Sequence, residues 1–286
     1  ARTESMAAVA GGVTTICDMP NTIPQATTVS ALEEKKRIYE SKSLCNFGFY
    51  VGGAKMLPSE NTHLKDGTNS MHLNIPDLLE AEQLPYVVAI KIFMAESTGA
   101  MTIYEQEFLE ELFAETHKLI AVHAEDEVRR LERLEMARKG LLQDETAGSK
   151  SGPALSMTDP YIHAIIRDNQ VAALGTKRAV ELAITYKHQT HILHMSAAEE
   201  LEYLTAGIEA GYVTGETCPH YLLFTRDDIK THAGYRIMNP ALKGKTDKEA
   251  LIHAIQSGLI SQITTDHAPH LTQEKDLPYG QIPAGI

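Results

Sequence analysis

Residues Gln262 to His270 read Gln-Ile-Thr-Thr-Asp-His-Ala-Pro-His. The β-branched start of this stretch predicts a short strand, Gln262 to Asp266, and an acid and two histidines gather at its C-terminal end. In a closed parallel barrel, catalytic side chains lie at the C-terminal ends of the strands, because the loops there converge on one mouth. We therefore expect other strands of this chain to end in chemically active residues as well.

Six earlier stretches share this strand-like character and alternate with longer segments of helical periodicity. Paired glycines, Gly11-Gly12 and Gly52-Gly53, stand beside the first two of them. All are short and mostly apolar, which is typical of buried strands in a parallel sheet. The expected strands are Val13 to Asp18, Asn46 to Val51, Val87 to Met94, Leu119 to Ala124, His191 to Met195 and Tyr212 to Thr217.

The segments between the strands repeat their apolar residues with the period of an α-helix. One further segment, Leu57 to His72, is polar and long enough to be a surface loop. The expected helices are Glu4 to Ala10, Ser30 to Ser41, Ile75 to Gln83, Tyr104 to His117, Asp126 to Lys139, Asp159 to Lys187, Ala197 to Ala210 and Thr246 to Ser257.

This alternation predicts an α/β protein built from βαβ units. Seven strands and a leading helix fit an incomplete (β/α)8 barrel of the TIM type, with about seven βα units present and the first strand and last helix missing. We expect residues 1–286 to form one partial barrel domain, and the abrupt start at Ala1 and loop-like end at Ile286 indicate a fragment. Strand counting alone also allows an open doubly wound sheet, but the polar strand ends favour the barrel.

Composition excludes several classes of function. A formal net charge of -12 and a pI near 5.5 argue against a nucleic-acid-binding surface, which needs clustered Lys and Arg. No apolar run approaches the roughly 18 residues that span a bilayer. The three cysteines form no Cys-x-x-Cys pair, so neither a disulfide framework nor a thiolate zinc site is indicated. We expect a soluble, cytoplasmic protein with no nucleic-acid or membrane partner.

Three strand ends carry residues that zinc prefers, namely His123, His194 and Asp266. A single histidine at a strand end is more often a hydrogen-bonded core residue than a ligand. Three such ends on separate strands favour a hydrolytic metal site, which needs an open position for a water molecule. The remaining histidines fall in helices or loops and are expected to be solvated; they include His63, His72, His117, His163, His188, His232 and His253.

Lys91 lies in the middle of a predicted buried strand, where an ammonium group is expensive to bury without an anion or metal beside it. Two explanations stay open. Carbon dioxide can carbamylate the amine and turn it into a carboxylate that bridges two metal ions. Alternatively, Lys91 can pair at the barrel rim with an acid such as Glu125 or Glu216.

Several blocks of this sequence resemble the dihydroorotases of the cyclic amidohydrolase group, and together they extend over essentially the whole chain. Asp18-Met19-Pro20-Asn21-Thr22 resembles the block whose Asn holds the substrate carboxylate, which implies that role for Asn21. Lys91-Ile92-Phe93-Met94 is similar to the block whose Lys is carboxylated in many relatives, although some bacterial enzymes use an Asp. The resemblance therefore implies two Zn²⁺ ions bridged by carboxylated Lys91.

Two further blocks resemble those that each give the family one histidine metal ligand. They are Val122-His123-Ala124-Glu125 and His191-Ile192-Leu193-His194-Met195-Ser196. In the second block we choose His194 as the ligand, because His191 lies nearer the start of the strand. The block Glu216 to Leu222 occurs broadly in the superfamily and does not discriminate between substrates.

The last two blocks are more selective. Asn239-Pro240-Ala241-Leu242-Lys243 resembles a dihydroorotase block whose Asn contacts the pyrimidine ring, whereas hydantoinase-like relatives usually have Ser there. Within Thr265 to His270, the resemblance implies that Asp266 is a metal ligand and the catalytic proton carrier. It also implies that His270 binds the substrate; allantoinases and dihydropyrimidinases lack this histidine.

The implied activity is the reversible, zinc-hydroxide-dependent hydrolysis of (S)-dihydroorotate to N-carbamoyl-L-aspartate in de novo pyrimidine biosynthesis. The family's first strand supplies His-x-His and then an Arg, and a small β-domain accompanies the barrel. Neither is found in this chain, so we expect the chain alone to be inactive.

Two other readings remain. One is a different cyclic amidohydrolase, a hydantoinase, dihydropyrimidinase or allantoinase, against which Asn239 and His270 argue. The other is a non-catalytic dihydroorotase-like subunit that partners aspartate transcarbamoylase. The expected partners are a small-molecule substrate and either a second copy of the chain or aspartate transcarbamoylase.

Overall fold

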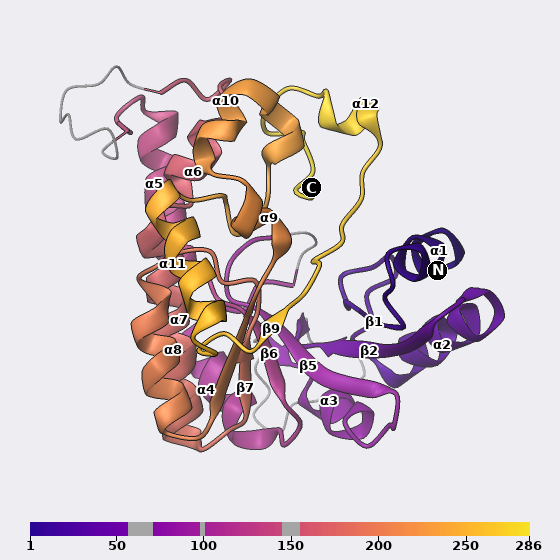
Figure 1. Cartoon of the computed structure of the whole chain (residues 1–286). Coiled ribbons are helices and arrows are strands. Elements are labelled where there is room, and N and C mark those ends of the chain that lie inside the picture. The colour runs from indigo at the N-terminus through magenta and orange to yellow at the C-terminus, as the bar shows by residue number, and fades with distance from the viewer. Residues whose placement is uncertain (57–70, 98–100, 145–154) are drawn as a thin grey trace. The chain divides into compact units, whose positions relative to one another are not determined.

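The computed structural model describes residues 1–56, 71–97, 101–144 and 155–286 (Figure 1). The predicted surface loop Leu57 to His72, except for its last two residues, lies outside the described residues, as does His63. Within the described residues, no helix is both long enough and apolar enough to cross a lipid bilayer.

All seven predicted strands are present, and they follow one another in sequence order across a single sheet. This order distinguishes the two folds that strand counting allowed, because a doubly wound sheet reverses its strand order at a switch point and a barrel does not. The incomplete TIM-type fold is therefore confirmed. The strands in sheet order are β1 Thr15–Asp18, β2 Asn46–Gly52, β5 Val87–Phe93, β6 Ile120–His123, β7 Thr190–Ile192, β8 Val213–Thr217 and β9 Gln262–Ile263.

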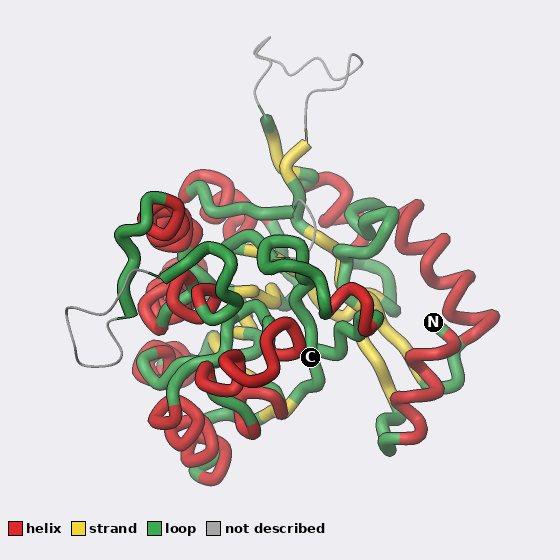
Figure 2. The backbone as a smooth tube through the Cα atoms, turned by 90° about the horizontal axis from the view of Figure 1, so that it is seen from above, coloured by secondary structure: helices red, strands yellow, loops and turns green. Residues whose placement is uncertain are grey.

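The register is parallel at the strand pairs that hold the site. Thr190 lies opposite Val213, and Glu216 lies opposite Gln262. In the N-terminal part of the sheet, Thr15 lies opposite Asn46. A separate antiparallel pair, β3 (Lys55–Met56) and β4 (His72–Leu73), projects from its surroundings in Figure 2.

The helices that sequence periodicity predicts are present, with one exception. The structure also contains several short helical turns that periodicity cannot detect, because each is about one turn long. The helices are α1 Arg2–Ala10, α2 Val29–Lys42, α3 Ile75–Ala81, α4 Gln106–Glu115, α5 Glu127–Arg138, α6 Ile162–Ile166, α7 Asn169–Tyr186, α8 Glu200–Glu209, α9 Pro219–Leu223, α10 Ile229–His232, α11 Lys245–Gln256 and α12 Thr272–Lys275, with 3-10 turns η2 Arg226–Asp228 and η3 Ala233–Arg236.

The exception is the predicted helix Asp159 to Lys187, which is wrong as a single element. The structure breaks it between α6 and α7 at Arg167, whose φ of -94° and ψ of 64° are not helical. Asp168 then caps α7, because its carboxylate accepts a hydrogen bond from the Val171 N–H at 2.9 Å. The break places the Arg167 side chain against Glu125, which in turn contacts the predicted metal ligand His123.

The expectation that the strands are uniformly buried is wrong for the two edge strands. β1 alternates between exposed and half-buried residues, and both residues of β9 are exposed. By contrast, the interior strand β5 is buried at every residue except Val88. The difference follows from the sheet order, since an edge strand has a neighbour on one side only.

The chain divides into two compact units, each with its own core. The first comprises residues 1–122 and 185–189, and the second comprises residues 123–184 and 190–286. In the first unit, an aromatic cluster packs β2 against α2. The Phe49 ring lies 5.2 Å from Tyr39 and 6.1 Å from Tyr86, measured between centroids.

In the second unit, buried polar contacts join the helices beside β7 and β8. The Thr176 hydroxyl of α7 donates to Glu200 of α8 at 2.7 Å. The Asn169 amide at the start of α7 donates to Asp247 of α11, also at 2.7 Å. Figure 1 shows the three helices running beside one another. Gly207 of α8 lies directly against Val213 of β8, which leaves no room for a larger residue.

Gly175 lets α7 approach the backbone that follows β6. A Cβ atom at this position would lie 2.5 Å from the Ala124 carbonyl and 2.6 Å from the Glu125 Cα. Contacts this short cannot exist without movement of the backbone. Gly175 therefore sets how closely α7 packs behind the segment that contains His123.

We predict that Gly175→Ala lowers the free energy of unfolding by about 3 kcal/mol, because the atoms in its way belong to rigid backbone. Urea denaturation measures the change in the free energy of unfolding. Gly11→Ala is the control: its Cβ would come no closer than 3.5 Å to any atom. We expect it to change stability by less than about 0.5 kcal/mol. Equal effects of the two substitutions would contradict the close approach.

Candidate active site

Hydrogen bonds between neighbouring strands bring the predicted site residues of the second unit to one edge of the sheet. The Met195 N–H donates to the Glu216 carbonyl at 2.8 Å, and the Thr264 N–H donates to the Thr217 carbonyl at 3.0 Å. The segments that follow β7, β8 and β9 therefore start level with one another. His194, His220 and Asp266 lie on these three segments, and His123 ends β6.

His123 and His194 face each other. Nδ1 of His123 lies 3.0 Å from Nε2 of His194, and the two rings are 4.7 Å apart at 74°. Both are buried, with 1% and 6% of their surface exposed. Two imidazole nitrogens on one tetrahedral zinc ion, each at about 2.1 Å, lie about 3.4 Å apart. The pair thus has nearly the spacing that shared zinc coordination requires.

Two of the predicted ligands have an unusual backbone conformation. His194 has a φ of +40° and Asp266 a φ of +45°, in the left-handed region that favours glycine. Such a conformation costs about 1–3 kcal/mol at a residue with a side chain. The surrounding structure holds this strain in place, and it does so at two residues whose sequence blocks predict metal binding.

Asp266 lies in a second group of potential ligands. Its carboxylate, a ring nitrogen of His220 and the Cys218 thiol lie within 4.8 Å of one another. Nε2 of His220 is buried and has no hydrogen-bond partner among the described residues. Burial lowers the pKa of His220 to about 4, so the ring is neutral near pH 7. A neutral imidazole and a carboxylate are the donors that zinc prefers, so this group fits a zinc ion.

Cys218 fits less well as a ligand. Its side chain is fully buried, and burial, Asp266 and Glu216 all raise the pKa of its thiol far above the ordinary value. Zinc binds the thiolate and not the thiol. The thiol lies 3.7 Å from the Thr264 hydroxyl. His220 and Asp266 are therefore the members of this group that could hold a metal ion.

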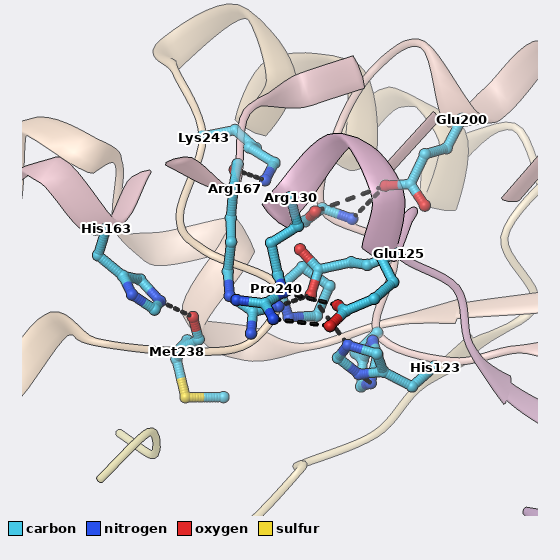
Figure 3. Close-up of polar contacts among 12 residues, drawn as sticks. His123, Glu125, Arg130, His163, Arg167, Glu200, Met238, Pro240 and Lys243 are labelled. Atoms are coloured by element: carbon cyan, nitrogen blue, oxygen red, sulfur yellow. Dashed lines mark hydrogen bonds and ion pairs between the residues drawn. The ribbon is translucent and has the colours of Figure 1, made fainter. Parts of the chain in front are cut away.

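His123 also contacts a buried ion pair (Figure 3). Its Nε2 lies 2.9 Å from Oε2 of Glu125, and the same oxygen accepts a short hydrogen bond from the Arg167 guanidinium. Burial alone would raise the pKa of Glu125, but Arg167 and His123 together hold it well below its usual range. Glu125 is therefore ionised near neutral pH and accepts both hydrogen bonds.

The loop from Met238 to Lys243 contains the predicted substrate ligand Asn239. Its neighbours fix the loop: His163 Nε2 donates to the Met238 carbonyl at 2.8 Å, and the Tyr221 hydroxyl donates to the Pro240 carbonyl at 2.7 Å. The side-chain oxygen of Asn239 is buried and has no hydrogen-bond partner among the described residues. A buried acceptor of this kind is available to a ligand.

His270, the other predicted substrate ligand of the second unit, is half-buried. Its Nε2 lies 3.1 Å from the Ala284 carbonyl, and its Nδ1 lies 3.7 Å from the Glu274 carboxylate. The segment that bears Ala284 is itself fixed, because the Gly285 N–H donates to the Ile237 carbonyl at 2.9 Å. The structure therefore connects His270 to the start of the Asn239 loop.

The remaining two predicted residues, Lys91 and Asn21, belong to the first unit. Lys91 is 1% exposed, and its ammonium lies 4.4 Å from the centre of the Phe93 ring. Asn21 is half-buried and follows a turn that Lys35 holds. The Lys35 ammonium pairs with Asp18 at 2.8 Å and donates to the Met19 carbonyl at 2.6 Å.

The two acids that the sequence offered as partners of Lys91 are engaged within the second unit. Glu125 binds Arg167 and His123, and Glu216 lies 3.0 Å from Nε2 of His191. Carboxylation of Lys91 stays a prediction. So do the metal-binding roles of His123, His194 and Asp266 and the substrate-binding roles of Asn21, Asn239 and His270.

The expectation that the remaining histidines are solvated is wrong for two of them. His163 and His188 are 9% and 6% exposed. His188 donates from Nε2 to the Thr116 carbonyl at 3.0 Å, and His163 donates to the loop described above. His117 is exposed as expected. Both failures have one cause, since hydrogen bonds between residues distant in sequence leave no local pattern.

Sequence reasoning also missed residues that complete the site. Only Arg167 had a local signal, because the Asp168 that follows it is a typical helix N-cap. The others were visible merely as polar residues beside a recognised block: Glu125, His163, His220, Lys243 and Lys35.

No protein-family model matches this chain. Solved structures share this fold. L-hydantoinase (dihydropyrimidinase) from Arthrobacter aurescens superimposes with a TM-score of 0.79 at 24% identity, over 99% of this chain and 57% of that one. Dihydroorotase from Saccharomyces cerevisiae, in complex with 5-fluoroorotic acid, superimposes with a TM-score of 0.67 at 19% identity, over 99% and 69%. The chain therefore has the same fold as the corresponding part of these two enzymes.

Sequence similarity is more specific. The chain is 33% identical to a dihydroorotase of Methanosarcina acetivorans over 294 aligned residues, which cover 99% of this chain and 55% of the relative. The resemblance to dihydroorotases is therefore confirmed along nearly the whole chain. The chain spans little more than half the length of the curated relatives it matches.

Burial of His163 should make the folding stability of the protein depend on pH in the acid range. Burial and the nearby Arg167 lower the pKa of His163 to about 4, below the unfolded value near 6.5. Between about pH 6.5 and 4 the unfolded chain binds a proton that the folded chain does not, so folding stability falls as the pH falls. The loss amounts to about 3 kcal/mol at most.

We therefore expect His163→Gln, which keeps a donor for the Met238 carbonyl, to lose less stability than the unsubstituted protein between pH 7 and pH 4.5. Urea denaturation at both pH values measures this difference. His253→Gln, at an exposed position of α11, is the control and should keep the original pH dependence. An unchanged pH dependence in His163→Gln would show that the ring does not titrate as described.

Proposed function

We propose that this chain carries the barrel of a zinc-dependent dihydroorotase. The reaction is the reversible hydrolysis of (S)-dihydroorotate to N-carbamoyl-L-aspartate. The reverse direction closes the ring and is a step of de novo pyrimidine biosynthesis. The observation that carries this proposal is the pairing of His123 with His194 at 3.0 Å, at the carboxyl ends of β6 and β7. The relatives named dihydroorotase support the choice of substrate.

The donors present fit zinc, and we assign His123, His194, His220 and Asp266 to hold it. Bound zinc supplies a Lewis acid that polarises a carbonyl and lowers the pKa of a water molecule. The carboxylate of Asp266 takes the proton of the attacking water and gives it to the ring nitrogen. The amide C–N bond breaks and a C–O bond forms, and the nitrogen, which keeps its own hydrogen and gains this proton, becomes the NH2 of the carbamoyl group.

Substrate orientation falls to three residues. The amide of Asn239 has a buried acceptor that can receive an N–H of the ring. Asn21 and His270 offer donors for the substrate carboxylate. A net charge of -12 opposes the approach of an anionic substrate, so these donors and the metal must supply a local positive potential.

The finer features of the parent enzyme belong to the same proposal. We propose that residues 1–286 form a single barrel domain, that two zinc ions are bound, and that carboxylated Lys91 bridges them. Burial of Lys91 supports the bridge, because carboxylation replaces a buried cation with an anion that metal ions neutralise. We further propose a cytoplasmic enzyme that forms a homodimer or associates with aspartate transcarbamoylase.

The choice of substrate is tested with the protein as its gene encodes it. We expect kcat/KM for dihydroorotate to exceed the values for dihydrouracil, hydantoin and allantoin by at least about tenfold, because hydrogen bonds to a charged group contribute about 1.5–3 kcal/mol. A preference for a neutral ring would instead assign the protein to the hydantoinases, which the fold similarity also allows. Absence of turnover together with absence of bound zinc would indicate a non-catalytic subunit.

The ligand assignment is tested by His194→Ala. We expect this variant to bind less zinc per polypeptide, measured by atomic emission after dialysis, and to lose more than about a hundredfold in kcat, since even loss of an outer partner costs 10–100-fold. The matched control is His188→Ala, which removes a buried histidine that contacts Thr116. The control should keep its zinc, and an unchanged zinc content in His194→Ala would refute the assignment.

A further inference from the structure

We infer that the buried Glu125–Arg167 pair is a positioning device that fixes which ring nitrogen of His123 faces the metal, and that links this ligand to the loop bearing Asn239. The inference rests on the proposed zinc site. It concerns residues that do not touch substrate, and it assigns a function to an ion pair that the mechanism above does not use.

The contact with Glu125 determines which ring nitrogen of His123 carries the proton. Nε2 lies 2.9 Å from Oε2 of Glu125, and Nδ1 lies 3.0 Å from His194. An ionised carboxylate only accepts hydrogen bonds, so Nε2 must carry the proton. A neutral imidazole has one N–H, which leaves the lone pair on Nδ1. Glu125 would thereby let Nδ1 bind a zinc ion, as outer carboxylates do for histidine ligands in many metal sites.

The buried carboxylate of Glu125 needs a positive charge beside it. Glu125 is completely buried, and a buried carboxylate without a counter-charge is strongly unfavourable. Arg167 supplies that charge and is itself only 5% exposed. Its guanidinium donates to Oε2, the same oxygen that His123 contacts, while Oε1 has no partner among the described residues. Both interactions therefore act through one oxygen and fix the carboxylate's orientation.

The Glu125–Arg167 pair also connects to the Met238 to Lys243 loop (Figure 3). The carbonyl of Arg167 accepts a hydrogen bond from the Lys243 ammonium at 2.6 Å, and Lys243 is 3% exposed. Four residues before Arg167, the ring of His163 donates to the Met238 carbonyl at 2.8 Å. The short segment from His163 to Arg167 thus holds both ends of the Met238 to Lys243 loop.

The break between α6 and α7 makes this arrangement possible. In a continuous helix, the Arg167 carbonyl would accept a hydrogen bond from the helix backbone four residues later. Because Arg167 is not helical, its carbonyl is available to Lys243. One residue therefore contacts the loop with its backbone and the carboxylate behind His123 with its side chain.

The test uses two readouts that do not depend on turnover. Long-range ¹H–¹⁵N spectra of the metal-free protein, labelled at histidine, distinguish protonation at Nε2 from protonation at Nδ1. Competition with a chromophoric chelator gives the zinc dissociation constant. We expect unsubstituted His123 to show the Nε2–H tautomer. In Glu125→Gln we expect a mixture of tautomers and zinc binding weaker by about 10–100-fold.

Two further variants separate positioning from general stability. Arg167→Met should weaken zinc binding as Glu125→Gln does, whereas Arg167→Lys, which keeps the charge, should restore part of the affinity. The matched control is Glu82→Gln, which alters another buried glutamate that contacts a histidine, His117, at 3.0 Å. The control should leave zinc affinity unchanged.

The Nδ1–H tautomer of His123 in the unsubstituted protein would overturn the inference, and this outcome needs no variant to fold. Unchanged zinc affinity and tautomer in a folded Glu125→Gln protein would overturn it as well. A wrong choice of substrate can be distinguished from a wrong positioning role, because neither measurement involves dihydroorotate. If zinc affinity and the His123 tautomer change in Glu125→Gln, the positioning role stands, whichever ring the enzyme opens.

Discussion

Parallel hydrogen bonding between β7, β8 and β9 is the constraint on which the site depends. Each strand supplies only one or two useful side chains, and the chain separates His194 from Asp266 by some seventy positions. Because the strands are parallel and the segments after them start level, side chains that follow separate helical crossovers meet at this edge. The chemistry is thus assembled by backbone geometry before any side chain contributes.

A group of buried charged side chains lies behind this edge of the sheet. Arg167 and Lys243 are buried cations, and Glu125 and Glu200 are buried acids beside them. Burial raises the pKa of Glu200, although hydrogen bonds from Thr176 and two backbone N–H groups oppose this. In a region of low polarisability, a network of this kind is rigid when complete and costly when any member is removed.

Much of the fold could be predicted because strands and helices leave local periodic patterns. The seven strands were predicted from short apolar runs, and the polar residues after them predicted a candidate site that stays a prediction. Burial at the edges could not be predicted, since the pattern of β1 does not show whether it has one neighbour or two. The helix break at Arg167 was missed because apolar periodicity continues through it, although Asp168 gave a capping signal.

The sequence motifs of the candidate site could be predicted, but the contacts between its residues could not. His123, His194 and Asp266 were recognised from residues adjacent to them in the sequence. The partner of His123 is an acid two positions away that pairs with Arg167, 42 positions further on. His163 and Lys35 likewise act on backbone carbonyls that no sequence pattern identifies. Contacts of this kind depend on the tertiary structure alone.

The left-handed backbone at His194 and Asp266 has a consequence for how such a protein can change over evolutionary time. Glycine would adopt these conformations without strain, so the two side chains are kept at a cost to stability. Under the proposed function, selection for turnover and selection for robustness act in opposite directions at these two positions. A descendant that had no use for the two side chains would be free to relax the backbone there, and would gain stability.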